Sequence, residues 1–477
     1  MSPRFTLLTA FMLLFHCAQA ASPLEQALLQ AVRDAHFDQL IDFGPANEDR
    51  DIKPGSAQRI AHPPNVDLAV IQLDAAGRAV ACANVLLSRD YPQGVVVPVT
   101  LDDGAANVRF LRWDIDRWNG GAFAPGTNQP HTPKGWTNLP ALTEADAIIP
   151  GRTNAPLQFM APYPASLFKL MVAFQVFRAV DAGEITLTNA VTYRNGDAKP
   201  ETRPLLAWLD PMITVSDNHA TKALIQWLHQ QRRIETLNRE FRELGLGTLQ
   251  LNGTRAEDGY GWGPGRFHMT AFDTARLLWL IEGSGGELWR RPDGKPVTAQ
   301  FLSAESRACL KQLLHDQALH EALSTTCLFG APEVRPGIPA IIADRWINPT
   351  NGHVIAHDID FGRDVRPALA QAEVTFAHKT GLTYNYASDA GIVTSLPGKP
   401  FRRYIIAFLA NTGYRYTDEA FANRARGPYA DKVSPIAYTQ RIPALGRRLD
   451  EAITRIASKV ESKSEGQSDR RPEVGNQ

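Results

Sequence analysis

Residues 164–180 read PASLFKLMVAFQVFRAV. The apolar side chains of this stretch recur at intervals of three and four residues, which is the spacing of one face of a helix. They are Leu167, Leu170, Met171, Phe174 and Phe177. The stretch therefore predicts a helix over residues 166–180 that packs into a core, with Ser166 and Lys169 in its first turn.

Further helices and strands are expected on the C-terminal side of this stretch. Amphipathic spacing predicts helices over residues 203–209, 220–230, 234–244, 271–282 and 304–323. Strand patterns follow over 373–378, 390–395 and 403–410, and the last two flank a turn at 397–400 as in an antiparallel hairpin. A terminal helix over 443–458 completes a predicted domain of residues 151–458.

Short apolar runs separated by Pro, Gly and Asp turns occupy the N-terminal side. They predict strands over residues 66–73, 79–87, 95–99 and 108–115. These strands form either a separate β-rich domain or edge strands of the main sheet. Residues 21–150 are therefore treated as a β-rich N-terminal region of unassigned role.

The two ends of the chain have their own patterns. Arg4 precedes an apolar run over residues 5–15 and the small-residue sequence Ala18-Gln-Ala20, the order of a secretory signal and its cleavage site. The run is shorter than the roughly 20 apolar residues that a membrane-spanning helix needs. We expect cleavage after Ala20, a secreted or periplasmic protein, and no stable membrane anchor. Residues 459–477 are almost without apolar side chains and predict a disordered tail.

Composition argues against some classes of partner. Lys plus Arg and Asp plus Glu both total 50 among 477 residues, so no overall field attracts nucleic acid, and we expect none as a partner. Without the signal, Cys82, Cys309 and Cys327 remain. Either Cys309 pairs with Cys327 or the thiols stay buried and free. No Cys-x-x-Cys pattern indicates zinc, and no cofactor is expected.

Three short motifs follow one another along the chain: Ser166-Leu-Phe-Lys169, Ser216-Asp-Asn218 and Lys379-Thr-Gly381. Taken singly, they are more typical of a solvated lysine, a helix cap and a strand end than of catalysis. Together they occur in the order, and on the elements, that acyl transfer to a serine requires. An amine held one turn from a hydroxyl in a partly desolvated site can lose its proton and activate that hydroxyl.

These motifs resemble those of the class A β-lactamases and the related penicillin-binding proteins. The sequence from Pro211 to Asn218 resembles the family's approach to its second motif, and residues 269–275 resemble the helix after its omega loop. Residues 389–393 resemble the next strand, so the resemblance covers about 155–455. It implies an α+β fold in which an antiparallel sheet packs on a helical subdomain, preceded here by the β-rich N-terminal region.

The resemblance also implies roles for individual residues. Ser166 would be the nucleophile and Lys169 its base, with Ser216 passing a proton to the leaving nitrogen. Asn218 would bind the side-chain amide of the substrate. The substrate would be a small-molecule β-lactam or a stem peptide of peptidoglycan.

The third motif would bind the other end of the substrate. Lys379 and Thr380 would hold the substrate carboxylate by charge-assisted hydrogen bonds. The backbone N–H groups of Ser166 and Leu382, the latter directly after Gly381, would form the oxyanion hole. Leu382 departs from the small or hydroxylated residue that is commoner in the family, and its bulk affects which substrate fits.

Rapid hydrolysis in this family depends on a glutamate in the omega loop, and here the pattern departs. Glu257 lies about where that residue is expected, but the usual surrounding Glu-x-x-Leu-Asn is absent. The sequence leaves Glu257 either as the base that activates water or as a surface carboxylate, with Asp258 the weaker candidate.

Residues 328–372 form a segment longer than compact family members carry, and we treat it as an insert. His353 and His357, four residues apart, have the spacing of a metal pair. No motif supplies a third ligand, and residues 348–352 favour a turn over a helix. We therefore expect a lid or an interaction insert and no metal.

Three functions agree with these observations. The first is an exported serine hydrolase that forms an acyl-enzyme with β-lactams and hydrolyses their amide bond. The second is a peptidase or transpeptidase of the D-alanyl-D-alanine type that is acylated and deacylates slowly. The third is a non-catalytic periplasmic binding protein on the same fold.

Overall fold

The computed structural model describes residues 21–42, 58–60, 62–114, 142–196, 198–283, 286–331, 334–357, 359–421 and 438–468. The predicted signal peptide lies outside these ranges. None of the helices within them is both long enough and apolar enough to span a membrane.

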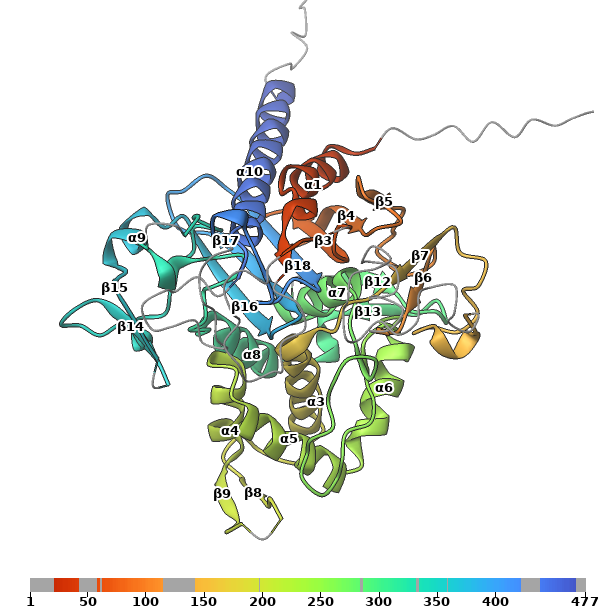
Figure 1. The fold of residues 1–477 in the computed structure, drawn as a ribbon. Coiled ribbons are helices and arrows are strands. Elements are labelled where there is room, and N and C mark those ends of the chain that lie inside the picture. The colour runs from red at the N-terminus through yellow and green to blue at the C-terminus, as the bar shows by residue number, and fades with distance from the viewer. Residues whose placement is uncertain are drawn as a thin grey trace, which may run out of the picture.

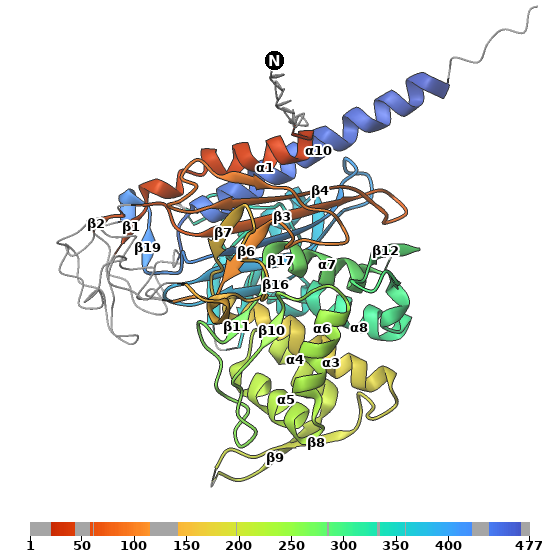
Figure 2. The ribbon, with the colours of Figure 1, turned by 90° about the vertical axis from the view of Figure 1, so that its right-hand side faces the viewer.

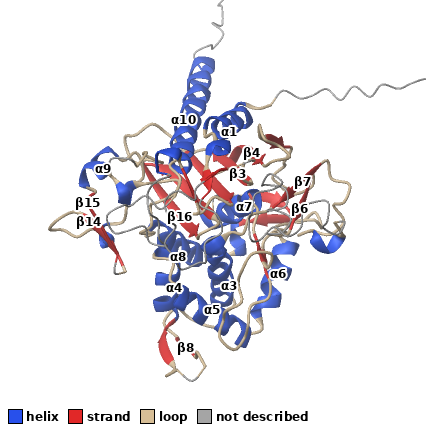
Figure 3. Cartoon of the chain, in the orientation of Figure 1, coloured by secondary structure: helices blue, strands red, loops and turns tan. Residues whose placement is uncertain are grey.

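A six-stranded antiparallel sheet lies at the centre of the fold (Figures 1 and 3). Its strands, in spatial order, are β16 (Val374–Leu382), β17 (Ala387–Ser395), β18 (Arg403–Ala410), β3 (Val66–Leu73), β4 (Ala79–Leu87) and β5 (Val95–Val97). Long apolar runs with β-branched residues form these strands, because both faces of the sheet are covered. Strands β3 and β18 are buried along nearly their whole length.

The N-terminal strands belong to this sheet. Tyr404 of β18 pairs with Gln72 of β3, and Ile406 pairs with Val70, so the pairing joins opposite ends of the chain. The sheet therefore crosses residue 151, and residues 21–150 do not form a region separate from residues 151–458. Of the two alternatives that the sequence leaves open, the N-terminal strands are part of the main sheet and not a separate β-rich domain. The predicted domain boundary between residues 150 and 151 is therefore corrected.

Helices cover both faces of the sheet (Figure 2). On one face lie α3 (Lys169–Asp181), α4 (Leu205–Thr214), α5 (Asn218–Gln230), α6 (Arg233–Glu243), α7 (Ala271–Glu282) and α8 (Ala304–His315). On the other lie α1 (Pro23–Asp34) and α10 (Arg441–Ser468), which pack on each other. The result is an α+β fold with one apolar core on each face of the sheet, as the resemblance implies.

Shorter elements join these layers. Most form two-stranded ribbons: β6 (Val108–Leu111) with β7 (Leu157–Met160), β8 (Ala190–Tyr193) with β9 (Glu201–Pro204), β10 (Gln250–Leu251) with β11 (Phe267–His268), β12 (Glu287–Arg290) with β13 (Pro296–Thr298), and β14 (His353–Ala356) with β15 (Ile359–Asp364). Three very short strands, β1 (Ile41–Asp42), β2 (Gln58–Arg59) and β19 (Tyr416–Thr417), form a separate small sheet. Helix α9 (Arg366–Gln371) leads into β16.

Several predicted boundaries are corrected by the structure. The helix expected over 304–323 ends at His315, and residues 316–325 form a buried connection. The helix expected to begin at residue 203 begins at Leu205, after β9. The tail predicted to be disordered is helical as far as Ser468, and its lysines and glutamates are residues that favour a helix. Residues 469–477 lie outside the described residues.

Candidate active site

Ser166 lies on the short 3₁₀ helix Ala165–Phe168, directly before α3. This turn is held by the carbonyl oxygen of Pro164, which accepts hydrogen bonds from Leu167 N (3.2 Å) and from the hydroxyl of Ser388 on β17 (2.6 Å). Ala165 has a left-handed φ of 47°, a conformation that costs energy in a residue with a side chain. Ser166 is therefore presented by a constrained turn and keeps partial exposure.

Gly381 sets the separation between this turn and the sheet. A Cβ atom at Gly381 would lie 2.4 Å from the carbonyl oxygen of Pro164 and 2.6 Å from Leu167 N. No side chain fits in that space. Strand β16 therefore passes directly beside the turn that carries Ser166.

Two buried lysines meet at Ser216. Lys169 Nζ donates to Ser216 O (2.5 Å) and Asn218 Oδ1 (2.8 Å), and lies 3.2 Å from Ser216 Oγ. Lys379 Nζ donates to Ser216 Oγ (2.9 Å) and Thr380 O (2.7 Å). Both lysine side chains are 0% exposed. The three motifs, dispersed along the sequence, thus form one hydrogen-bonded network.

The charges of this network favour a free amine at Lys169. Burial lowers the pKa of Lys169 well below its usual value, and the neighbouring Lys379 lowers it further, against the opposing effect of Asp217. A neutral amine has two N–H donors, which the oxygens of Ser216 and Asn218 can use. Its lone pair is then available to accept a proton from a hydroxyl.

Lys379 differs from Lys169 in its counter-charges. Burial lowers the pKa of Lys379 to about 7, while Asp389 and Glu321 act in the opposite direction. Near neutral pH a large share of Lys379 is therefore ammonium. A charged donor beside a hydroxyl suits the binding of an anionic group.

The loop between α4 and α5 places Ser216. Ser216 has a left-handed φ of 60°, and Asp217 N donates to Pro211 O (2.9 Å). Asp217 caps α5, its carboxylate accepting from Ala220 N (2.6 Å). Within the Ser216-Asp-Asn218 motif, the middle residue is thus a helix cap, while its neighbours contact the lysines.

Thr380 and Leu382 occupy different positions in the site. Thr380 pairs with Asp389 across the strands, so its side chain lies on the sheet face opposite to Lys379. Of Thr380, only the carbonyl oxygen takes part in the described network. Leu382 pairs with Ala387, next to the hydrogen-bonded pair of Thr383 with Tyr386. Because such pairs alternate, the Leu382 N–H is directed away from β17, as an oxyanion hole requires.

Glu257 is not part of this network. Its side chain is exposed, and its backbone oxygen accepts a hydrogen bond from Gln226 Nε2 (2.7 Å). None of the described hydrogen bonds joins the Glu257 carboxylate to Ser166 or to Lys169. Asp258 is bound by Arg255, and this pairing lowers the pKa of its carboxyl group.

The insert packs against the loop that carries Ser216. Trp346 Nε1 donates to Asp316 O (2.6 Å), and its ring packs on a small core that includes Val215 and Ala356. His357 Nε2 lies 3.6 Å from the carboxylate of Asp217. The insert therefore forms a fixed wall beside the second motif.

The two histidines of the insert contact different carboxylates. His353 Nδ1 lies 3.0 Å from Asp360 Oδ1, whereas His357, with a φ of 54°, turns toward Asp217. In the described part of the chain, no group of three or more His, Cys, Asp or Glu side chains is arranged to hold a metal ion. Cys82, Cys309 and Cys327 are free thiols, so the bridge between Cys309 and Cys327 is not formed.

Sequence reasoning missed a buried cluster behind Lys379. Asp389 accepts hydrogen bonds from His378 Nδ1 (2.7 Å) and Leu323 N (3.1 Å), and both side chains are 0% exposed. The signal that could have found it is a histidine and an aspartate within strands that otherwise read as buried. Such residues rarely lie in a core unless they are paired.

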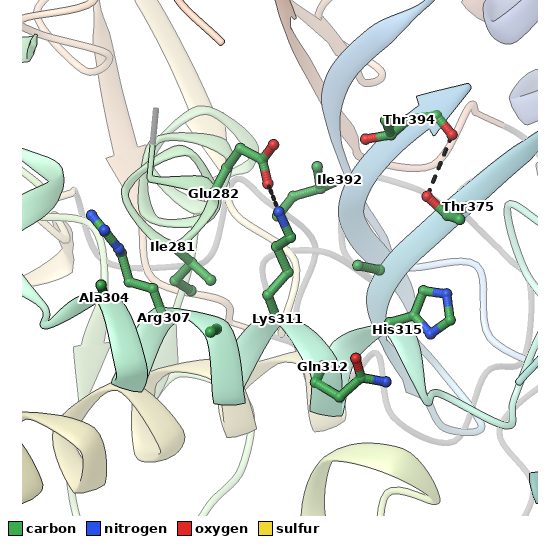
Figure 4. Close-up of a pocket in the computed structure, with 12 residues that line it drawn as sticks. Ile281, Glu282, Ala304, Arg307, Lys311, Gln312, His315, Thr375, Ile392 and Thr394 are labelled. Atoms are coloured by element: carbon green, nitrogen blue, oxygen red, sulfur yellow. Dashed lines mark hydrogen bonds and ion pairs between the residues drawn. The ribbon is translucent and has the colours of Figure 1, made fainter. Parts of the chain in front are cut away.

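A separate cavity of about 340 Å³ lies between α8 and strands β16 and β17 (Figure 4). Arg307, Lys311 and His315 line it from α8, and Lys311 Nζ donates to Glu282 Oε2 at 2.8 Å. None of the site residues predicted from the sequence lines this cavity.

The site thus combines two buried lysines, Ser216 and Asn218 in one hydrogen-bonded network. Residues 161–327 match the beta-lactamase enzyme family, a segment that contains Ser166, Lys169, Ser216 and Asn218. Over this segment, about a third of the chain, the protein is similar to the beta-lactamase enzyme family.

Solved structures similar to the chain include PBP-A, at 20% identity over 62% of this chain and 82% of that one, with a TM-score of 0.36. A PBP-A mutant in an acyl-enzyme complex with penicillin G has 20% identity over 64% and 88%, with a TM-score of 0.36. A beta-lactamase from Sphaerobacter thermophilus has 18% identity over 62% and 84%, with a TM-score of 0.36. No curated protein matches the chain.

Proposed function

We propose that this protein is acylated at Ser166 by β-lactam amides and releases the acyl group slowly. The observation that carries the proposal is the network in which Lys169 and Lys379 both contact Ser216. Within this network, Lys169 is the residue that lies one turn after Ser166. This network contains a candidate base, a proton path and a cation.

The proposed reaction uses each part once. The free amine of Lys169 takes the proton of the Ser166 hydroxyl as its oxygen attacks the amide carbon. The N–H groups of Ser166 and Leu382 stabilise the oxyanion. The carbon–nitrogen bond then breaks, and the proton passes through Ser216 to the leaving nitrogen. An ester on Ser166 and a ring-opened amine on the same molecule result.

Binding of the substrate is proposed to use opposite ends of the network. Lys379 binds the substrate carboxylate, and Asn218 binds the side-chain amide. The wall formed by the insert restricts which substrate side chains fit, whereas the Leu382 side chain packs against the core on the opposite face of the sheet. A stem peptide of peptidoglycan ending in D-alanine has the same carboxylate and amide, and is the proposed natural substrate of an exported protein.

Slow release is proposed because of Glu257. Hydrolysis of the ester needs a base that activates water close to the ester carbon. The exposed position of Glu257, outside the described network, does not supply one. The acyl-enzyme is therefore expected to accumulate, as in a penicillin-binding protein of the D-alanyl-D-alanine peptidase type.

Intact-mass spectrometry after mixing with benzylpenicillin tests this proposal. We expect a rapid mass increase of one penicillin that persists for many minutes, and no increase in Ser166→Ala. Ser388→Ala is not a suitable control because Ser388 holds the nucleophile turn. Ser303→Ala, which changes a helix-capping serine at α8, serves instead. Absence of any adduct in the folded protein would contradict acylation.

A second candidate is a β-lactamase with rapid turnover, and it is favoured by the family match over residues 161–327. In that case the adduct is transient, and nitrocefin is hydrolysed continuously in a manner that depends on Ser166. Loss of turnover in Glu257→Gln would then assign the base. Release of D-alanine from a stem peptide favours the first candidate.

A further inference from the structure

The site contains two buried lysines whose chemical tasks are opposite. In the proposed function, on which this inference rests, Lys169 must be a free amine and Lys379 an ammonium. Burial lowers the pKa of both lysines, and the charge of Lys379 lowers the pKa of Lys169 further. Something other than burial must therefore make the two lysines unequal.

The strand next to Lys379 carries a buried acid. Lys379 pairs with Ala390 of β17, and the preceding residue on β17 is Asp389. Asp389 is 0% exposed and receives two N–H groups, from His378 Nδ1 (2.7 Å) and from Leu323 N (3.1 Å). Two donors of this kind favour a carboxylate over a neutral acid.

His378 is built to hold this carboxylate without adding charge. Burial and the nearby Lys379 lower the pKa of His378 well below its usual value, so the ring is a neutral donor. The ring stacks on Phe376, with centroids 4.1 Å apart, and His320 covers it edge-on at 4.5 Å. Gly391 stands directly opposite His378, and a Cβ there would lie 2.4 Å from His378 Cβ. The pair is thus sterically enclosed.

Burial shifts the pKa values of Asp389 and Lys379 in opposite directions. Burial raises the pKa of Asp389 well above its usual value and lowers that of Lys379 to about 7, while each group opposes the shift of the other. Burying either the carboxylate or the ammonium alone costs free energy, and burying both costs less because their charges attract each other. Glu321, half-buried with a pKa raised to about 7, adds a second acid on the same side.

We propose that Asp389, held in place by His378, is a positioning residue that keeps Lys379 in its ammonium form and so leaves Lys169 as the free amine. The pair acts through the sheet, since His378 and Asp389 lie on the face opposite to Lys379. Because only Lys379 lies close to this carboxylate, Lys379 keeps its proton as the acid and Lys169 is left as the base.

The groups that bear on Lys379 come from every element around it. His378 lies on the same strand, Asp389 on β17, and His320 with Glu321 on the connection after α8. Lys169 faces Lys379 from α3. Of these, Asp389 and Glu321 are the groups that favour the charged form of Lys379.

Asp389→Asn removes the charge and keeps the shape and an acceptor for His378. A direct readout follows the side-chain nitrogens of ¹⁵N-labelled lysine by NMR from pH 5 to 10, with Lys379 assigned from Lys379→Arg. We expect the titration midpoint of Lys379 to fall by about one unit or more in the variant. The upper pH limit of benzylpenicillin acylation is expected to fall by the same amount.

Asp67→Asn is the matched control, because Asp67 is also a buried sheet carboxylate that accepts one backbone and one side-chain N–H. It should leave the Lys379 midpoint unchanged. If Asp389→Asn does not fold, Glu321→Gln is the second variant. It should also lower the titration midpoint of Lys379, by a smaller amount. An unchanged Lys379 midpoint in the folded variants would overturn the inference. Failure of the wild-type protein to react with penicillin would instead overturn the proposed function, because the NMR titration does not depend on activity.

Discussion

Lys169 is enclosed by protein and still has polar partners, which is the combination that a lysine base needs. Its Nζ atom donates to the oxygens of Ser216 and Asn218, and burial lowers its pKa. Such a lysine can be a free amine at neutral pH, where an exposed lysine is almost fully protonated.

Lys169→Ala is expected to slow acylation of Ser166 by about 10²–10⁴-fold, the usual contribution of a general base. Stopped-flow measurement with a fluorescent penicillin at pH 7 gives the rate, and thermal unfolding confirms that the variant is folded. Lys295→Ala, which removes an exposed lysine paired with Asp293, should react like the wild type. A rate within tenfold of wild type in Lys169→Ala would show that another group is the base.

Residue patterns alone located this site only in part. Ser166, Lys169, Ser216, Asn218 and Lys379 were predicted from short motifs, and the structure brings the last four into one described network. Glu257 could not be assigned, because its role depends on how a glycine-rich loop folds back toward the site. That path depends on contacts of the loop with distant elements, which leave no periodic signal in the sequence.

The insert acts at the scale of whole elements. Its hairpin of β14 and β15 packs with Trp346 against the loop that holds Ser216, and Arg345 forms ion pairs with Asp210 and Asp316 at the surface. The packed aromatic side chain is expected to contribute more to the free energy of unfolding than the exposed ion pairs.

Trp346→Ala is expected to lower the free energy of unfolding by about 2–3 kcal/mol, because a half-buried indole and its hydrogen bond to Asp316 O are lost. The same change should slow acylation several-fold by loosening the loop of Ser216. Urea unfolding and penicillin acylation measure the two effects. Arg345→Ala, in the adjacent position, should change stability by no more than about 1 kcal/mol. Equal effects of the two variants would contradict a packing role for the insert.

At the scale of the whole molecule, N-terminal and central segments depend on each other. Asp67 on β3 accepts hydrogen bonds from Ala271 N at the start of α7 (2.8 Å) and from Asn84 (2.8 Å). Burial raises the pKa of Asp67 from 3.8 to about 6. A strand of the N-terminal region thus supplies a hydrogen-bond acceptor for the first turn of α7, a helix on the C-terminal side of residue 150.

The sign of the pH effect at Asp67 follows from its raised pKa. Folding favours the protonated acid, so this contribution to stability is complete below pH 4 and is lost as the pH rises through about 6. Asp67→Asn should therefore gain stability relative to wild type between pH 4.5 and pH 8, by about 1–3 kcal/mol. Urea unfolding at both pH values measures it. A difference between the proteins that is independent of pH would refute the assignment.

Removal of residues 21–150 is expected to prevent folding. Without β3, the edge of β18 and both apolar cores would be exposed to water. A chain starting at residue 151 should show no cooperative thermal transition, whereas a chain starting at residue 21 should unfold in one. Soluble, penicillin-reactive protein from the shorter chain would contradict the single shared sheet.

The sequence by itself determined the features that depend on neighbouring residues. The buried helix after Ser166 follows from apolar spacing, and the α+β class and the prediction of Ser166 as nucleophile follow from three short motifs in order. Tertiary structure alone decided that β3 pairs with β18, that Glu257 lies outside the network, and that Asp389 stands behind Lys379. The physical reason is that helix periodicity is local, whereas strand pairing and burial of charge join residues that are hundreds of positions apart.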